Sequence, residues 1–392
     1  MLRIRHVFFL LLFVAGCNFG SGPAPIEIGH VSDKTRLDRA GAHAELGIRL
    51  ALAELSKDDA LATAFGGRKV QVRHTDTRGQ LDAFESQAVR LDSVNRCVAV
   101  LGGVSPAETS RLANGAVPLL TFQGQPIAGA STHIFYIGMT PIRQGAALAK
   151  VVAEDAKLSH VAVIVDDKRS EAVAAADSFQ KTLNEVRKDA KPSLLRLGFS
   201  TESSSATSNK SNGTARSSEP IDWSRIVERM KGQGTQVVVF AGSVQDFNNW
   251  HRVLRKEGEK LKPKLVFAGP DGSHALLDVG GDSIDVLLAS AFDVSADKAS
   301  TFVKAYRDMH QADPDVHAAL AYDGLRILVE AMKKTPAQLT SEKLREELLK
   351  TKDFEGVTGA LTFTSERMLT RPVFVQRMRG GVLTQIKVFP AE

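Results

Sequence analysis

The stretch CVAVLGGVSPAET, residues 97–109, holds the pattern that decides the fold. Residues 97–101 are a continuous apolar run, which is typical of a strand buried on both faces of a parallel sheet. Gly102-Gly103 then interrupts the run, and Ser105 and Glu108 stand where a helix places its N-cap and the acid of a capping box. A buried strand that passes through a glycine turn into a helix predicts one unit of an α/β fold.

Similar units recur along most of the chain. A strand is expected at residues 26–29, and a half-exposed strand at residues 69–73, where apolar and polar residues alternate. Further apolar runs suited to buried strands lie at residues 117–121, 161–165, 237–241, 265–268 and 286–289. Amphipathic helical patterns separate most of them, at residues 41–55, 142–154, 171–186, 223–231 and 246–257. This alternation predicts mostly parallel sheets covered by helices on both faces. Three short antiparallel strands are expected near the end, at residues 361–363, 373–378 and 382–389.

Residues 200–220 interrupt this rhythm. They are rich in Ser, Thr, Asn and Gly and contain few side chains that could be buried. Such a segment cannot offset the entropy lost on ordering, so we expect a disordered insertion on the surface. The alternative to a tolerated insertion is a docking or modification site, suggested by the triplets Asn209-Lys210-Ser211 and Asn212-Gly213-Thr214.

Composition and motifs exclude several classes of protein. The chain has 392 residues, 43% of them hydrophobic and 24% charged, as in ordinary globular proteins. Its net charge is +5, but basic residues alternate with acidic ones, which argues against nucleic-acid binding. Metalloprotease, serine-hydrolase, phosphate-loop and Cys-x-x-Cys motifs are missing from the sequence, and its ten histidines show no helical metal-ligand spacing. Asp166-Asp167 could hold a metal ion, but we favour strand-end carboxylates in a polar cleft. We therefore expect no enzyme, no metal and no cofactor.

The N-terminus resembles a bacterial lipoprotein signal. Residues 1–6 carry two arginines and no acid, residues 7–14 are apolar, and Ala15-Gly16 precede Cys17. The resemblance implies a signal peptide over residues 1–16, cleavage before Cys17, lipid on Cys17 and a tether over residues 17–25. An ordinary secretory signal with an incidental cysteine is the alternative. Asn18 after Cys17 is similar to lipoproteins that are sent to an outer membrane.

The rest of the chain resembles the leucine/isoleucine/valine-binding family, solute-binding proteins of ABC importers. The similar motifs are Ile28-Gly29 followed by Gly41 and Gly47, Val100-Leu101-Gly102 with Ser105, residues 118–121, 161–166 and 267–272, Asp222-Trp223, Ala321-Tyr322-Asp323, and residues 354–359. The resemblance implies the type I periplasmic binding fold, two Rossmann-like lobes joined by three crossover strands near residues 136–141, 291–295 and 355–359. Lobe 1 would comprise residues 26–138 and 294–356. Lobe 2 would comprise residues 139–293 and 357–392.

Ligands of open parallel sheets bind beyond the carboxyl ends of the strands. On the family pattern, Ser105, Gly124 and Gln125 of lobe 1 would hold a ligand carboxylate, and Asp271 of lobe 2 would pair with its ammonium group. Ser105 and Asp271 also have structural explanations, as a helix cap and a turn residue.

The sequence also departs from the amino-acid-binding pattern. Ser170 and Ser243 stand where lobe 2 often has aromatic residues, and Ala40 stands where an aromatic side chain often closes the pocket. These smaller side chains predict a more open and polar cleft. The ligand could then be a larger or more polar amino acid, an amide or a short peptide.

We therefore expect a lipid-anchored extracytoplasmic protein that delivers a small amphoteric ligand to an ABC permease. Its contacts would be the ligand, the permease and, through lipid alone, the membrane. The main alternative is a sensing receptor that acts on a cell-envelope or signalling partner without transport. A hydrolase on the same fold would need a nucleophile and base that the sequence does not offer.

Overall fold

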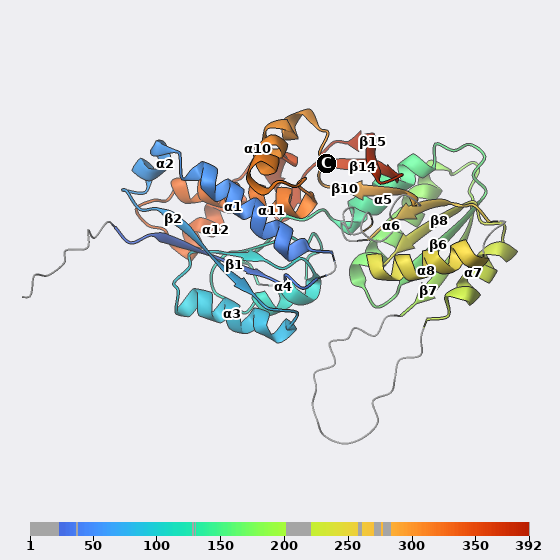
Figure 1. Cartoon of the computed structure of the whole chain (residues 1–392), viewed down its shortest axis with the longest axis horizontal. Coiled ribbons are helices and arrows are strands. Elements are labelled where there is room, and N and C mark those ends of the chain that lie inside the picture. Colours follow the sequence, from blue (N-terminus) through green and yellow to red (C-terminus); the bar gives the residue numbers. More distant parts are fainter. Residues whose placement is uncertain are drawn as a thin grey trace, which may run out of the picture.

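The structure is a computed structural model that describes residues 23–36, 38–127, 129, 131–200, 221–257, 261–269, 276 and 284–391. Two lobes lie side by side, each built on its own sheet (Figure 1). The expected signal peptide, Cys17 and Asp271 lie outside the described residues, and so does the insertion beyond Ser200. Within the described part of the chain, no helix is both long and apolar enough to span a bilayer.

Lobe 1 contains a five-stranded parallel sheet in the order β2-β1-β3-β4-β5. Its strands are β1 (Ile26–Ser32), β2 (Val70–Asp76), β3 (Val100–Gly102), β4 (Leu119–Thr121) and β5 (Ile134–Tyr136). One face packs against α1 (Ala40–Leu55), α2 (Asp59–Ala64), α10 (Ser300–His310), α11 (Val316–Lys333) and α12 (Ser341–Leu349). The other face packs against α3 (Leu81–Ser93) and α4 (Pro106–Leu112). Helices α1 and α11 lie so close that a Cβ atom on Gly47 would be 2.0 Å from the carbonyl oxygen of Ala318.

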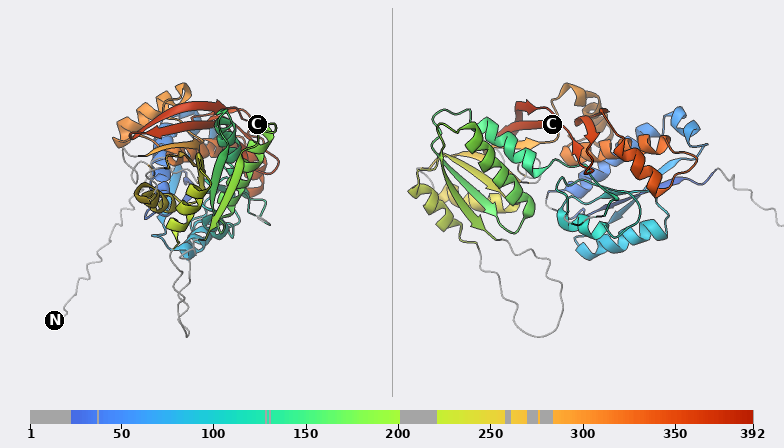
Figure 2. Two further views of the ribbon diagram at one scale, coloured as in Figure 1. Left: turned by 90° about the vertical axis from the view of Figure 1, so that its right-hand side faces the viewer. Right: turned by 180° about the vertical axis from the view of Figure 1, so that it is seen from behind.

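Lobe 2 contains a seven-stranded sheet in the order β15-β14-β10-β9-β8-β6-β7. Its parallel strands are β6 (His160–Asp166), β7 (Ser193–Phe199), β8 (Val237–Ala241), β9 (Lys264–Phe267) and β10 (Asp285–Ser290). The last two strands, β14 (Val373–Arg379) and β15 (Val382–Phe389), are antiparallel, as the sequence predicted. Helices α5 (Pro141–Val152) and α6 (Ser170–Val186) cover one face, and α7 (Trp223–Gly232) and α8 (Val244–Glu257) cover the other (Figure 2). The predicted α/β fold with mostly parallel sheets is confirmed.

The chain passes between the lobes three times. The first passage follows β5 and leads to α5 of lobe 2. The second follows β10, because Ala291 and Phe292, directly after this strand, pack in the core of lobe 1. The third passage was expected near residues 355–359, and the packing of the residues that follow bears on its position. Strands β11 (Phe354–Gly356), β12 (Gly359–Phe363) and β13 (Leu369–Thr370) form a small antiparallel sheet whose Leu361, Phe363 and Leu369 pack in lobe 1. We therefore propose that lobe 1 extends to Thr370 and that lobe 2 resumes at β14.

A buried arginine joins the first and third passages. The Arg371 guanidinium donates to the carbonyl oxygen of Ile137 and to Oγ1 of Thr358, the latter at 3.2 Å. Asp323 of α11 accepts hydrogen bonds from the backbone nitrogens of Val357 and Thr358 and from the Thr358 hydroxyl, at 2.9, 3.0 and 2.6 Å. These contacts position the strands between the lobes, and with them the two walls of the space that the lobes enclose.

Candidate functional site

A cleft of about 620 Å³ lies between the two lobes. Its lobe 1 wall comes from the loops after β3 and β4, and its lobe 2 wall from the loops after β6, β8 and β9. Strand-end loops are where parallel sheets place their ligands. Five of the six expected binding residues line the cleft, namely Ser105, Gly124, Gln125, Ser170 and Ser243. The sixth, Asp271, lies outside the described residues, although Gly269 two positions earlier lines the cleft.

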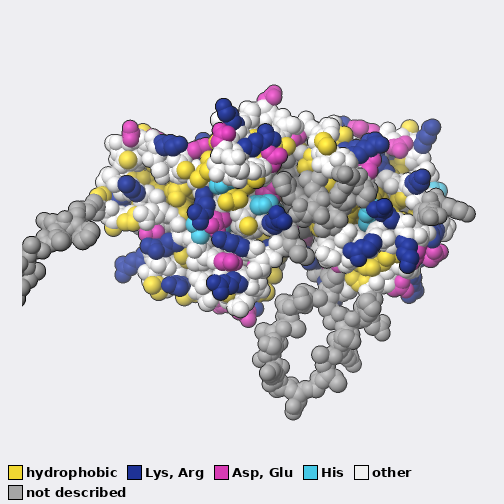
Figure 3. Space-filling model, viewed as in Figure 1, with side chains coloured by type: hydrophobic (Ala, Val, Ile, Leu, Met, Phe, Trp, Pro, Cys, Tyr) yellow, Lys and Arg dark blue, Asp and Glu magenta, His cyan; other side chains and the backbone are white. Residues whose placement is uncertain are grey.

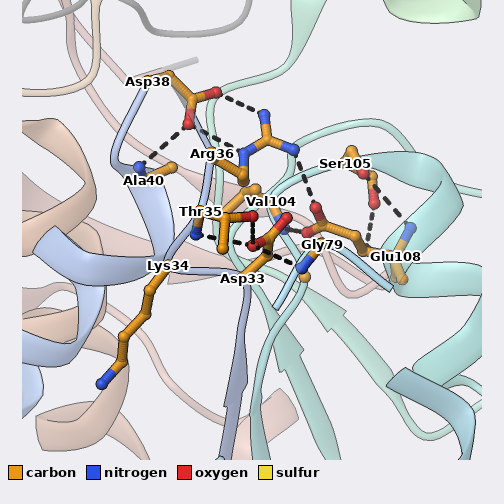
Figure 4. Close-up of polar contacts among 12 residues, drawn as sticks. Asp33, Lys34, Thr35, Arg36, Asp38, Ala40, Gly79, Val104, Ser105 and Glu108 are labelled. Carbon is orange, nitrogen blue, oxygen red and sulfur yellow. Dashed lines mark hydrogen bonds and ion pairs between the residues drawn. The ribbon is translucent and has the colours of Figure 1, made fainter. Parts of the chain in front are cut away.

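Ser105 has a structural role at the edge of the cleft. Its hydroxyl oxygen accepts a hydrogen bond from the backbone nitrogen of Glu108 at 3.3 Å and so caps α4. Oε2 of Glu108 accepts from the backbone nitrogen of Val104 at 2.8 Å, one residue earlier than a capping box requires (Figure 4). The predicted cap by Ser105 is present, but Glu108 binds the backbone nitrogen of Val104 instead of that of Ser105.

Arg36 organises the polar groups beside Ser105. Its guanidinium lies between two carboxylates, donating from Nε to Oδ1 of Asp38 and from Nη1 to Oε1 of Glu108, both at 2.9 Å (Figure 4). Burial alone would raise the pKa of Asp38, but the hydrogen bond and ion pair with Arg36 outweigh burial and lower it to about 2. Burial is the dominant cause at Glu108 and raises the pKa of that carboxyl. The sequence did not indicate Arg36, because its partner Glu108 is distant along the chain.

Two glutamines of the lobe 1 wall have unpaired polar atoms. Oε1 of Gln123 accepts from the backbone nitrogen of Gln125 at 2.6 Å. Nε2 of Gln123 and Oε1 of Gln125 are buried and have no hydrogen-bond partner among the described residues. Gly124 is required between them, because a Cβ atom there would lie 2.0 Å from the carbonyl oxygen of Met139 in the first passage. The cleft wall therefore holds one free donor and one free acceptor.

The lobe 2 wall is charged, and the carboxylates of Asp246 and of the adjacent Asp166 have partners within the lobe. Ser243 donates a short hydrogen bond to the Asp246 carboxylate, and its oxygen accepts from the Asp246 backbone nitrogen at 3.1 Å. Burial raises the pKa of Asp246, although the bond from Ser243 opposes the shift. Nε of Arg169 lies 3.2 Å from Oδ2 of Asp166. Ser170 begins α6 next to this pair.

A third glutamine in the cleft has its hydrogen bonds satisfied. Nε2 of Gln144 donates to the carbonyl oxygens of Gly269 and Ala289, at 2.6 and 3.4 Å. This amide ties α5 to the ends of β9 and β10. A Cβ atom on Gly269 would be 2.4 Å from the carbonyl oxygen of Gly242, so the strand ends approach closely here.

Apolar groups complete the cleft. Phe122, Met139, Val104 and Leu320 line it, together with His317. Ala40 does not line the cleft. It is buried at the start of α1, where its backbone nitrogen donates to Oδ1 of Asp38 at 3.1 Å. The cleft thus combines an apolar surface with a few polar groups, the usual composition of a small-molecule site.

Comparison with known proteins agrees with this architecture. Residues 210–382 match the model of a family described as periplasmic binding protein. No curated protein sequence matches the chain. The structure is similar to that of the leucine-binding protein LivK from Thermotoga maritima, with a TM-score of 0.76 and 21% identity, covering 93% of this chain and 99% of that one.

Two further solved structures are similar over the same extent. One is the branched-chain amino acid binding protein LivJ from Streptococcus pneumoniae with isoleucine, at a TM-score of 0.74 and 21% identity, covering 93% of this chain and 99% of that one. The other is an ABC-transporter solute-binding protein from Rhodopseudomonas palustris with 3,4-dihydroxybenzoic acid. It has a TM-score of 0.73 and 17% identity, covering 94% of this chain and 98% of that one. The chain therefore has the type I periplasmic binding fold, and the resemblance indicated by its motifs is confirmed.

Proposed function

We propose that this chain is a lipid-anchored extracytoplasmic solute-binding protein that captures a small ligand for an ABC importer. The observation that carries this proposal is the cleft between the lobes, whose lining includes Gln123 and Gln125, each with one buried amide atom that has no partner among the described residues. A buried polar atom without a partner costs about 1–3 kcal/mol, which a ligand would recover by pairing with it. The proposed ligand residues are Ser105, Gly124, Gln125, Ser170, Ser243 and Asp271, to which we add Gln123.

The cleft favours a ligand that bears a carboxylate. Nε2 of Gln123 is a donor that could bind one carboxylate oxygen, and Oε1 of Gln125 is an acceptor for a neighbouring ammonium or hydroxyl group. Isoleucine and 3,4-dihydroxybenzoic acid, which two of the similar proteins bind, both carry a carboxylate. Asp271 would distinguish the two ligand types, because its negative charge suits an ammonium group.

Closure of the lobes would couple binding to delivery. The ligand would touch both walls only when the lobes are closed, so binding shifts the population toward that state. The three passages between the lobes would serve as the hinge. The permease would then recognise the closed surface.

A thermal-shift screen over amino acids, amides, short peptides and aromatic acids tests the proposal. A ligand at about 100-fold its Kd stabilises the folded protein by about 2.7 kcal/mol. We expect at least one carboxylate-bearing compound to raise the Tm by several degrees. If none of these compounds raises it, the proposal of a small carboxylate ligand fails.

Asp271→Asn tests the amino-acid form of the proposal, because the substitution keeps the shape and removes the charge. Loss of a desolvated charge partner costs about 2–5 kcal/mol, so affinity for an amine-bearing ligand should fall by at least about 30-fold. Asp189→Asn, at an exposed position of lobe 2, is the control. Unchanged binding by Asp271→Asn would exclude Asp271 as the ammonium partner.

The lipid anchor is tested by metabolic labelling with radioactive fatty acid. Label should enter the wild type and be absent from Cys17→Ser, since the thiol is the expected attachment site. Equal labelling of both proteins would contradict the anchor.

A further inference from the structure

A second cluster of polar side chains lies in lobe 1, behind the wall of the cleft. His30 of β1 and His74 of β2 are register partners on adjacent parallel strands. Their Nδ1 atoms are 3.0 Å apart, and their rings meet edge to face. The His30 ring also lies 6.3 Å, centroid to centroid, from Phe122, which lines the cleft. The two histidines therefore converge on one point beneath α1.

Glu45 of α1 completes the cluster. One ring nitrogen from each histidine and one carboxylate oxygen of Glu45 all lie within 4.8 Å of one another. His30 is fully buried, Glu45 is 5% exposed, and His74 is partly buried. Three ligand-type atoms are thus held together by a sheet register and a packed helix, both of which are rigid elements.

The chemistry of the cluster suits a cation. Burial lowers the pKa of His30 to about 3 and that of His74 to about 4, so both imidazoles are neutral near pH 7. Neutral imidazole is the form that binds metal ions. Nε2 of His30 is also buried without a hydrogen-bond partner among the described residues. The two Nδ1 atoms hydrogen-bond to each other in the protein without an ion, so the geometry of these nitrogens with Glu45, and not an unpaired nitrogen, indicates a cation site.

We propose that His30, His74 and Glu45 form a binding site for one divalent transition-metal ion such as Zn²⁺, separate from the ligand cleft. Zn–N bonds of about 2.0–2.1 Å at tetrahedral angles place two ligating nitrogens about 3.3 Å apart. The observed Nδ1 separation of 3.0 Å is close to that value. The Glu45 carboxylate would supply a third ligand, and water would complete the tetrahedron.

Two cationic side chains form ion pairs with Glu45, and their positions predict which of them a metal ion would displace. Lys34 Nζ lies 2.5 Å from Oε2, and Arg49 Nη2 lies 2.6 Å from Oε1. The Lys34 side chain is 40% exposed, so its ammonium group can turn into solvent and release Oε2. Arg49 would remain on Oε1 and orient the carboxylate, as groups that hydrogen-bond to metal ligands commonly do. Lys34 and the metal ion therefore compete for the same oxygen.

Because Lys34 and the metal ion compete for Oε2, substitution of Lys34 distinguishes a metal site from a histidine pair with a purely structural role. The experiment uses the protein without a histidine tag, treated with a chelator and then titrated with Zn²⁺ alone by calorimetry. We expect one Zn²⁺ per chain in the wild type. His74→Ala should bind at least about tenfold more weakly, because it loses a ligand, whereas Lys34→Met should bind several-fold more tightly. His160→Ala, which removes a half-buried histidine of lobe 2, should match the wild type.

Visible absorption of the Co²⁺-loaded protein gives a second readout, since a tetrahedral site produces intense bands that His74→Ala should lose. The proposal is overturned if the wild type binds no Zn²⁺, or if His74→Ala binds it as tightly as the wild type. If His74→Ala does not fold, unchanged or weaker binding by Lys34→Met overturns it instead. None of these outcomes affects the solute-binding proposal, which rests on other residues.

Discussion

The two walls of the cleft differ in how their polar groups are satisfied. In lobe 1, Arg36 binds both Asp38 and Glu108, and the nearby glutamines leave one donor and one acceptor free. In lobe 2, Asp166 is held by Arg169 and Asp246 by Ser243, so these carboxylates already have partners within their own lobe. We infer that lobe 1 supplies the preformed hydrogen-bonding surface, and that lobe 2 closes over the ligand.

The charged side chains on one face of the molecule show no comparable difference between the lobes (Figure 3). Basic and acidic side chains are interspersed over both lobes on the face in Figure 3, without a large area of one sign. The comparison of the two walls of the cleft can be tested by substitution.

Arg36→Met should have the largest effect, because it leaves Glu108 buried and both carboxylates without their partner. Breaking such a pair costs about 3 kcal/mol of folding free energy. Arg111→Met is the control, since Arg111 is 41% exposed and pairs with the surface acids Asp82 and Glu85. Its loss should cost less than about 1 kcal/mol. If denaturant unfolding shows that both variants lose a similar free energy of unfolding, the ion pairs of Arg36 do not stabilise the lobe 1 wall.

Asp38→Asn should have the next largest effect, and the effect should depend on pH. The pKa of Asp38 falls from 3.8 to about 2 on folding. A lowered pKa gives stability that is present above pH 4 and is lost as the pH falls toward 2. Asp38→Asn should therefore cost about 2 kcal/mol at pH 7 and almost nothing at pH 2. A loss that is constant between pH 7 and pH 2 would contradict the ion pair with Arg36.

Gln144→Met should have a smaller effect on stability. It removes a satisfied amide and leaves the buried carbonyl oxygen of Gly269 without its closest donor, at a cost of about 1–2 kcal/mol. Thermal unfolding should show this as a Tm lower by several degrees. An unchanged Tm would mean that water replaces the amide and that the lobe 2 strand ends do not depend on it.

Local sequence patterns predicted much of the fold and part of the site. Ser105 follows a buried strand run, so the rule that ligands bind at strand ends placed it beside the cleft, whereas Ser170 and Ser243 were placed by the family resemblance. Arg36 and His30 could not be found in this way. Arg36 acts through Glu108, 72 positions away, and His30 meets His74 only through the register of β1 and β2.

Tertiary packing explains the other differences. Strand β5 is only three residues long and β7 is partly exposed, and the sequence analysis did not indicate either of them. The position of the third passage depends on whether β12 and β13 pack against lobe 1 or lobe 2, which we propose to be lobe 1. Residues 359–370 alternate in burial in a way that suits either sheet.

The most direct test of the central claim compares Gln125→Met with the wild type. Oε1 of Gln125 is buried without a partner in the described protein, so its removal should not destabilise the fold and should raise the free energy of unfolding by about 1–3 kcal/mol. The same change should weaken binding of the ligand found by the screen by about tenfold, because the ligand loses a hydrogen bond in a buried site. Calorimetric titration of both proteins gives the two affinities. Equal affinities would contradict the claim that the free polar atoms of lobe 1 recognise the ligand.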